Sequence, residues 1–148
     1  MNKIMTDNMK KAVNKLDQGG YTLVVVNGER EYTSKLSGVS PLLDIIKNAP
    51  EVLSGACVAD KIVGKAAAVL FVYSGVKEVY AKTVSSYAVL VLKKAGINLV
   101  YEKKVPYIKN RAGTDICPME KLVLDIGDPK AGAAALLKAG SPRAEGLS

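Results

Sequence analysis

The residue types able to carry out acid-base or metal chemistry are few in this chain, and histidine is absent. The 148 residues include two cysteines, Cys57 and Cys117, which belong to no C-x-x-C pair. Histidine is the commonest general base and metal ligand, so its absence removes the ordinary Ser-His and Cys-His nucleophile systems. Redox and zinc sites use more closely spaced thiols than these. The candidate functional groups are therefore carboxylates, lysines, hydroxyls and single thiols.

Three of these groups surround the start of an apolar segment. Apolar positions between Ile62 and Tyr73 recur every three or four residues, which predicts a helix with Asp60 as its N-cap. Lys61 and Lys65 are then expected one turn apart on the polar face of that helix. A helix N-terminus attracts anions, and two lysines beside it strengthen the preference. Asp60 is expected to cap the helix or, alternatively, to hydrogen-bond a hydroxyl or amine group of a ligand.

Two serines mark the start of another predicted helix. The segment 87–94 is apolar nearly all round, and Ser85 or Ser86 stands where its N-cap is expected. A helix of that composition is predicted to be buried. We therefore interpret Ser85 and Ser86 as caps first and as ligand contacts second.

A polar loop and a short helix supply the remaining candidates. Cys117 precedes Pro118 at the predicted helix start, where the helix dipole could stabilise a reactive thiolate. Because no histidine is available, a buried structural cysteine is the favoured interpretation. Glu120, at the third helical position, is expected to satisfy the helix's own start, as in a capping box. In the preceding loop, Asn110 and Arg111 are binding candidates, and Arg111 suits bidentate recognition of phosphate or carboxylate.

The other segments predict a sheet covered by helices. A β-branched run at 21–26 is followed by Asn27-Gly28 and a second strand at 31–33, the strongest short signal for a hairpin. A hairpin followed by strands that alternate with helices indicates a three-layer α/β/α sandwich with a mixed sheet. The other predicted elements are helices at 4–16, 42–47, 62–73, 87–94, 118–124 and 129–137, strands at 76–83 and 97–101, and a loop that extends to residue 59. The side chains expected in the core include Val69, Leu70, Val89, Leu90 and Leu92.

Length and composition fit one domain that folds without disulfides or a structural metal. We expect this domain at residues 1–139, followed by a flexible tail at 140–148. Apolar stretches are too short for a membrane helix, and the first residues lack the apolar block of a signal peptide, so a cytoplasmic protein is expected. The net charge of +7 is spread along the chain. This distribution favours a solvated basic face over a surface for RNA, and no RNA-binding motif accompanies it.

Three short segments resemble motifs of a known family. They are ADKIVGKAAA at residues 59–68, NR at 110–111 and CPME at 117–120. The family is an uncharacterised bacterial and archaeal domain of unknown function, and the resemblance extends over residues 5–138. Because that family is placed structurally with the cytidine deaminases, the resemblance implies a cytidine deaminase-like fold without an assigned reaction.

The metal site of the deaminases is missing from this sequence. Deaminases of this fold hold zinc between the N-termini of two helices, which carry a His-or-Cys-x-Glu motif and a P-C-x-x-C motif. In the positions that the resemblance assigns to them, this chain has VAD at 58–60 and VSSY at 84–87. We therefore expect no stoichiometric zinc and no deamination of cytidine, adenosine or guanine. No other cofactor is indicated.

The leading hypothesis is a metal-free binding protein for a nucleotide-like or other anionic small molecule. It depends on anion-binding helix ends and on the predicted convergence of Asp60, Lys61, Lys65, Arg111 and Cys117 around one pocket. One alternative is a metal-free hydrolase or group transferase with Asp60 or Cys117 as nucleophile or base. Another is a basic domain that binds RNA or a protein. A homo-oligomer is compatible with all three hypotheses.

Overall fold

The computed structural model describes residues 5–110 and 112–140 of the chain. The strands form a five-stranded sheet in the order β2-β1-β3-β4-β5. They are β1 (Leu23–Asn27), β2 (Arg30–Ser34), β3 (Cys57–Val63), β4 (Glu78–Ser85) and β5 (Asn98–Val105). The helices are α1 (Asp7–Gly19), α2 (Ser40–Asn48), the 3-10 turn η1 (Pro50–Val52), α3 (Lys65–Ser74), α4 (Ser86–Lys94), α5 (Pro118–Val123) and α6 (Pro129–Ala139).

The sheet joins an antiparallel hairpin to three parallel strands. β1 pairs antiparallel with β2 on one side and with β3 on the other, and β3, β4 and β5 run parallel. Parallel strands need crossover connections, which are usually helices that cover the faces of the sheet. Here α3 connects β3 to β4, and α4 connects β4 to β5. The hairpin and the mixed character of the sheet agree with the sequence prediction.

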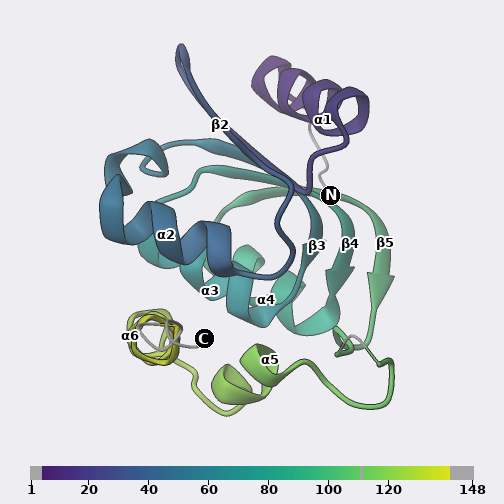
Figure 1. The fold of residues 1–148 in the computed structure, drawn as a ribbon, viewed down its shortest axis with the longest axis vertical. Coiled ribbons are helices and arrows are strands. Elements are labelled where there is room, and N and C mark those ends of the chain that lie inside the picture. Colours follow the sequence, from purple (N-terminus) through teal and green to yellow (C-terminus); the bar gives the residue numbers. More distant parts are fainter. Residues whose placement is uncertain (1–4, 111, 141–148) are drawn as a thin grey trace.

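Helices cover both faces of this sheet (Figure 1). α1 packs on one face, where Met9 and Leu16 meet a cluster that includes Val24 and Tyr80. α2, α3 and α4 lie on the opposite face, and α5 and α6 pack on the outer side of α3. Because α3 is enclosed between the sheet and these two helices, its residues 66–71 are all buried. The fold class expected from the sequence, a three-layer α/β/α sandwich, is confirmed.

Several helix starts follow local sequence signals. The Thr6 hydroxyl caps α1 by accepting a hydrogen bond from the Met9 amide at 3.2 Å. Asp128 caps α6 in the same way, and Pro129 occupies the first helical position as predicted. Ser85 caps α4. Each capping side chain lies within three residues of the amide from which it accepts, so these helices are capped by residues that directly precede them.

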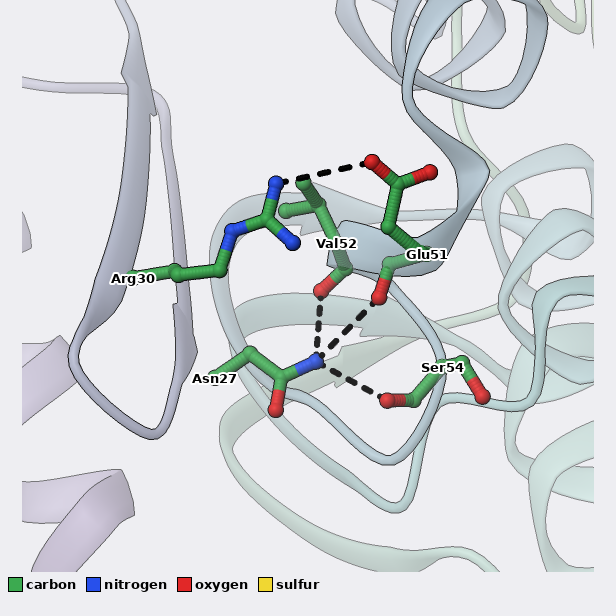
Figure 2. A network of polar contacts seen from close by, with 5 residues as sticks. All are labelled: Asn27, Arg30, Glu51, Val52 and Ser54. Carbon is green, nitrogen blue, oxygen red and sulfur yellow. Dashed lines mark hydrogen bonds and ion pairs between the residues drawn. The ribbon is translucent and has the colours of Figure 1, made fainter.

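The turn of the hairpin is attached to η1 by one side-chain amide (Figure 2). The Nδ2 group of Asn27 donates to the carbonyl oxygens of Val52 at 3.0 Å and Ser54 at 2.9 Å. A longer contact of 3.4 Å reaches the carbonyl of Glu51. Across the turn, Arg30 forms an exposed ion pair with the Glu51 carboxylate. The hairpin edge of the sheet is thus held against the segment that leads into β3.

The largest difference from the sequence prediction is the central strand β3. Residues 57–63 form this strand, whereas the sequence predicts a loop as far as Ala59 and a helix from Ile62. Asp60 lies within the strand, opposite Leu23 on one side and Ala81 on the other. The prediction that Asp60 caps a helix is therefore wrong.

The cause of this error is the spacing of apolar residues on either side of Gly64. α3 begins at Lys65, and Gly64 is its N-cap in an extended conformation. Ile62 and Val63 belong to β3, yet they continue the three- and four-residue spacing of α3 upstream. A period of that length cannot separate the end of a strand from the first turn of the helix that follows it.

Four of the five predicted core side chains are buried, namely Val69, Leu70, Val89 and Leu92. The fifth, Leu90, is 69% exposed, so its predicted burial is wrong. α4 packs on α3, β4 and β5. Leu90 points away from these neighbours. Because α4 is apolar nearly all round, its sequence does not show which face is exposed.

Two predictions fall outside the part of the chain that the structure describes. They concern the side chain of Arg111 and the tail, of which residues 141–148 lie beyond the described ranges. Among the described residues, none of the helices has the length and apolar character needed to cross a bilayer.

Candidate functional site

A cavity of about 720 Å³ lies at the carboxyl end of β3. Its walls come from the start of β1, the loop and first turn of α2, the end of β3 and the start of α5. Apolar side chains make up most of the lining. The polar lining residues include Asp60, Lys61, Lys109, Asn110, Cys117 and Glu120. In open α/β sheets ligands bind outside the carboxyl ends of the strands, which is where this cavity lies.

The N-termini of α2, α3 and α5 lie beside the cavity. Val39 and Leu42 line it from α2, and Gly64 and Ala67 line it from α3. The start of α4, which the resemblance to deaminases pairs with the start of α3, is not part of the cavity lining.

Ser85 and Ser86 lie at the start of α4, away from the cavity lining. The Ser85 hydroxyl is fully buried and accepts a hydrogen bond from the Ala88 amide at 3.0 Å. The Ser86 hydroxyl donates to the carbonyl oxygen of Val105 at 3.4 Å. The interpretation of Ser85 as a cap is confirmed, and the structure does not bring either serine to the cavity.

Asp60 is a carboxyl group at the wall of this mainly apolar cavity. It follows Ala59, which faces α1, and the alternation along β3 therefore directs Asp60 to the face that carries α2 and α3. Burial raises the pKa of Asp60 to about 7, against an opposing effect of the Ile62 and Lys61 backbone amides. The Ile62 amide donates to Asp60 over 3.4 Å, which is long for a hydrogen bond. Among the described residues no cation forms an ion pair with Asp60.

Glu120 reaches from α5 to the N-terminus of α3. Its Oε1 accepts a hydrogen bond from the Lys65 amide at 2.6 Å, and its Oε2 accepts one from the Ala66 amide at 2.9 Å. The side chain is 5% exposed. Burial raises the pKa of Glu120, while the two amides and the Lys65 ammonium act in the opposite direction. The expectation that Glu120 satisfies the start of its own helix is wrong, since its carboxylate caps a different helix.

Gly64 makes room for this carboxylate. A Cβ atom at Gly64 would lie 2.5 Å from the Glu120 carboxyl carbon and from both of its oxygens. Glycine as the N-cap also leaves α3 without a cap of its own. A glycine directly before a helix that lacks a Ser, Thr, Asp or Asn cap was the signal for a cap from elsewhere.

The two lysines that were predicted to share a helix face are separated. Lys61 is exposed in β3 and lines the cavity, and its backbone amide donates to the Thr22 carbonyl at 3.0 Å. The Lys65 ammonium donates to the carbonyl oxygen of Leu124 at 2.9 Å, just after α5. Lys65 is not part of the cavity lining. Of the five residues expected around one pocket, the structure brings together Asp60, Lys61 and Cys117.

Cys117 and Asn110 line the cavity from the segment before α5. Cys117 is partly buried, and its backbone amide donates to the Ile108 carbonyl at 2.9 Å. The Asn110 side chain accepts from the Thr114 amide at 3.1 Å and donates to the Thr114 hydroxyl at 3.3 Å. Asn110 therefore shapes its own loop, and Cys117 places a thiol at the cavity wall.

The residues present do not fit the zinc site of a deaminase. Cys57 is buried in β3 beneath α1, and burial raises the pKa of its thiol to about 12. Cys117 lies on the other side of the sheet, so the two thiols cannot ligate one ion, and the chain has no histidine. Within residues 5–110 and 112–140, no three Cys, Asp or Glu side chains are grouped so that they could hold a metal ion.

The fold and the cavity define a small α/β domain with an open mixed sheet and a ligand-sized hollow at the strand ends. The chain belongs to the DUF1893 family, a domain of unknown function, whose model matches residues 11–138. Membership in a family of unknown function confirms the resemblance found in the sequence. It assigns neither a ligand nor a reaction.

Solved structures agree with this family assignment. A DUF1893 family protein (TM1506) from Thermotoga maritima is 29% identical, with 93% of each chain covered and a TM-score of 0.84. A diaminohydroxyphosphoribosylaminopyrimidine deaminase/5-amino-6-(5-phosphoribosylamino)uracil reductase from the same organism is 16% identical, with 78% of this chain and 39% of that chain covered and a TM-score of 0.43. The second similarity is weak and bears on neither reaction nor ligand. Comparison with the curated proteins gave no match.

Proposed function

We propose that this domain is a binding protein for a nucleotide-like small molecule and that it acts without a bound metal. The observation that carries the proposal is Asp60, a carboxyl group at the wall of a mainly apolar cavity of about 720 Å³. Cavities that bind small molecules have this size and combine apolar walls with a few polar groups that fix orientation. A flat heterocyclic ring fits such walls, and its polar edge needs a partner such as Asp60.

The charged residues of the lining support a ligand that has a hydrogen-bond donor at one end and an anionic group at the other. The carboxylate of Asp60 can accept hydrogen bonds from an amino group on a ring. Lys109 lines the same cavity and is exposed, so its ammonium group is available to a phosphate at the solvent side. An amino-substituted base directed inward and a phosphate directed outward match this distribution.

The protonation of Asp60 gives the proposal a signed pH dependence. The pKa of Asp60 is about 7 in the folded chain, against about 3.9 for an ordinary aspartate. A ring amino group binds the ionised carboxylate, so affinity for such a ligand is expected to increase from pH 6 to pH 8. A ligand that offers a carbonyl to Asp60 needs the protonated form, and its affinity is expected to decrease over the same range.

Calorimetric titration with a panel of nucleoside 5′-monophosphates tests the proposal. At pH 8, Asp60→Asn is expected to weaken binding of an amino-substituted nucleotide about 10- to 100-fold, since a hydrogen bond to a charged group is lost. The matched control is Asp125→Asn, which changes an exposed aspartate outside the cavity lining and is expected to leave affinity unchanged. Equal affinity in the wild type and in Asp60→Asn would remove the cavity as the binding site.

The ligand-free protein provides a second measurement on Asp60. Folding raises the pKa of the Asp60 carboxyl group. Its contribution to the free energy of unfolding is therefore fully present at low pH and is lost as the pH rises through 7. Asp60→Asn removes this loss, and at pH 8 the variant is expected to be more stable than the wild type by about 1–2 kcal/mol. Urea denaturation at pH 5 and pH 8 measures the difference, and a variant less stable at pH 8 would contradict it.

A second candidate function is a metal-free hydrolase or group transferase. It is favoured by one observation, namely that the Cys117 thiol and the Asp60 carboxyl line the same cavity. A nucleophilic thiol needs a base to take its proton, and a carboxyl with a pKa near 7 can act as one. Intact-mass measurement after incubation with electrophilic phosphate and acyl esters is expected to show an adduct that Cys117→Ser abolishes. An unchanged mass with a nucleotide bound favours the binding protein, and salt-dependent RNA binding without nucleotide affinity would favour the basic domain.

A further inference from the structure

The buried carboxylate of Glu120 occupies the position that an anionic ligand would take at the N-terminus of α3. We infer that Glu120 is a specificity-determining residue, which excludes anionic groups from the inner end of the cavity and so orients the ligand with its anionic group at the solvent side. The orientation of the ligand rests on the proposed function. The exclusion of anions by Glu120 is a property of the chain alone and can be measured without that ligand.

The geometry is that of a bound anion. The carboxylate accepts from two successive backbone amides, those of Lys65 and Ala66, at 2.6 and 2.9 Å. These N–H groups of the first helical turn have no partner within the helix, and such groups bind phosphate or carboxylate ligands in other proteins. Glu120 is buried, and Gly64 leaves space that any larger residue would fill. The chain thus supplies an internal anion together with the room to hold it.

Among residues 5–110 and 112–140, no positive group compensates for this carboxylate on the cavity side. The Lys65 ammonium is bound to the Leu124 carbonyl and lies outside the cavity lining. The lysines that line the cavity, Lys61 and Lys109, are both exposed. Among the described residues that line the cavity, no buried cation would offset the repulsion between an anion at this end and the Glu120 carboxylate. Hydrogen-bond donors, such as ring amino groups, are favoured there instead.

Inorganic phosphate is a direct probe of this inference. In Glu120→Ala the amides of Lys65 and Ala66 lose their internal anion, and phosphate is expected to take its place. The melting temperature of the variant should then increase by about 3 °C or more in phosphate relative to chloride at equal ionic strength. The amide NMR signals of Lys65 and Ala66 should shift with phosphate concentration. The wild type is expected to show neither response.

Two further variants separate the role of Glu120 from a general effect. Glu120→Gln keeps the size of the side chain and removes its charge, so a smaller increase of melting temperature with phosphate is expected. Asp115→Asn removes an exposed ion pair with Lys121 beside α5 and should respond as the wild type does. If Glu120→Ala folds only in phosphate, the inference is supported.

Two results would overturn the inference. One is a phosphate-dependent shift of the Lys65 and Ala66 signals in the wild type. The other is the absence of any phosphate response in both Glu120 variants, including a failure of Glu120→Ala to fold in either salt. Neither result affects the nucleotide titrations of Asp60→Asn, so the proposed function and this inference can fail separately.

Discussion

The N-termini of α3 and α4 both have side-chain acceptors for their first backbone N–H groups, but the acceptors lie at different distances along the chain. Both helices leave backbone N–H groups in a buried region, and each group needs an acceptor. At α4 the acceptor is the hydroxyl of Ser85, which stands directly before the helix. At α3 the N-cap is Gly64, and the acceptor is the carboxylate of Glu120 on α5.

The two caps differ in what they stabilise: one stabilises a helix alone, and the other stabilises a helix together with its packing against a second helix. A cap such as Ser85 stabilises α4 wherever the rest of the chain lies. Glu120 stabilises α3 only while α5 is in place, so one interaction supports the helix and also fixes a wall of the cavity. A remote cap of this kind couples the shape of the site to the packing of the C-terminal helices.

The largest expected effect is that of Glu120→Ala. The substitution leaves the buried Ala66 amide and the partly buried Lys65 amide without acceptors, and we expect the free energy of unfolding to decrease by about 2–4 kcal/mol. Urea denaturation measures this loss, and Asp115→Asn, an exposed change near the same helix, should cost under about 0.5 kcal/mol. If the two variants lose similar amounts, the hydrogen bonds of Glu120 do not stabilise the fold.

Gly64→Ala tests the same contact from the side of α3. Its Cβ would crowd the Glu120 carboxylate, and a loss of about 1–3 kcal/mol is expected from overpacking. Combined with Glu120→Ala, most of that loss should disappear, because the crowded group is gone. Additive losses in this double-mutant cycle would show that Gly64 acts through something other than Glu120.

Ser85→Ala is expected to cost less, about 1 kcal/mol, as for a typical N-cap. The loss should be the same in the presence and absence of Glu120→Ala, since Ser85 binds within its own helix. Denaturation of the single and double variants checks both statements. A strong interaction between the two sites would mean that the two caps are not independent.

The smallest expected effect lies on the outer surface of α4. Leu90 is exposed, and Leu90→Ala should change the free energy of unfolding by less than about 0.5 kcal/mol. Leu92→Ala, two residues further along the same helix and fully buried, is expected to cost about 2–5 kcal/mol. Equal losses for the two variants would place Leu90 in an interface that the isolated chain does not show.

The parts of the fold that the sequence predicted correctly depend on neighbours in the chain. The hairpin follows from Asn27-Gly28, and the starts of α4 and α6 follow from Ser85 and Pro129. β3 was missed because Asp60 and Lys61 interrupt its apolar residues while Ile62 and Val63 continue the spacing of α3, so the local pattern is compatible with a strand and with a helix. Strand pairing with β1 and β4 decides between them, and that pairing is invisible in a local pattern.

The candidate site was predicted in part for the same reason. Asp60, Lys61, Asn110, Cys117 and Glu120 all line the cavity, as members of segments that were expected to meet there. Their roles were not predictable, since each depends on a contact between distant segments. Glu120 resembled a local cap because its position after Pro118 is typical of one, and only the folded chain shows that its partner is α3.

The separation between Glu120 and its partner amides also affects how the chain is made. The Lys65 amide precedes Glu120 by 55 residues. At synthesis rates of about 5–20 residues per second, α3 waits about 3–11 s before its acceptor has been added. The helices α5 and α6 that cover the outer side of α3 are added in the same late period. A nascent chain therefore presents an uncapped apolar helix for seconds, which is the kind of segment that chaperones bind and that aggregates when they are scarce.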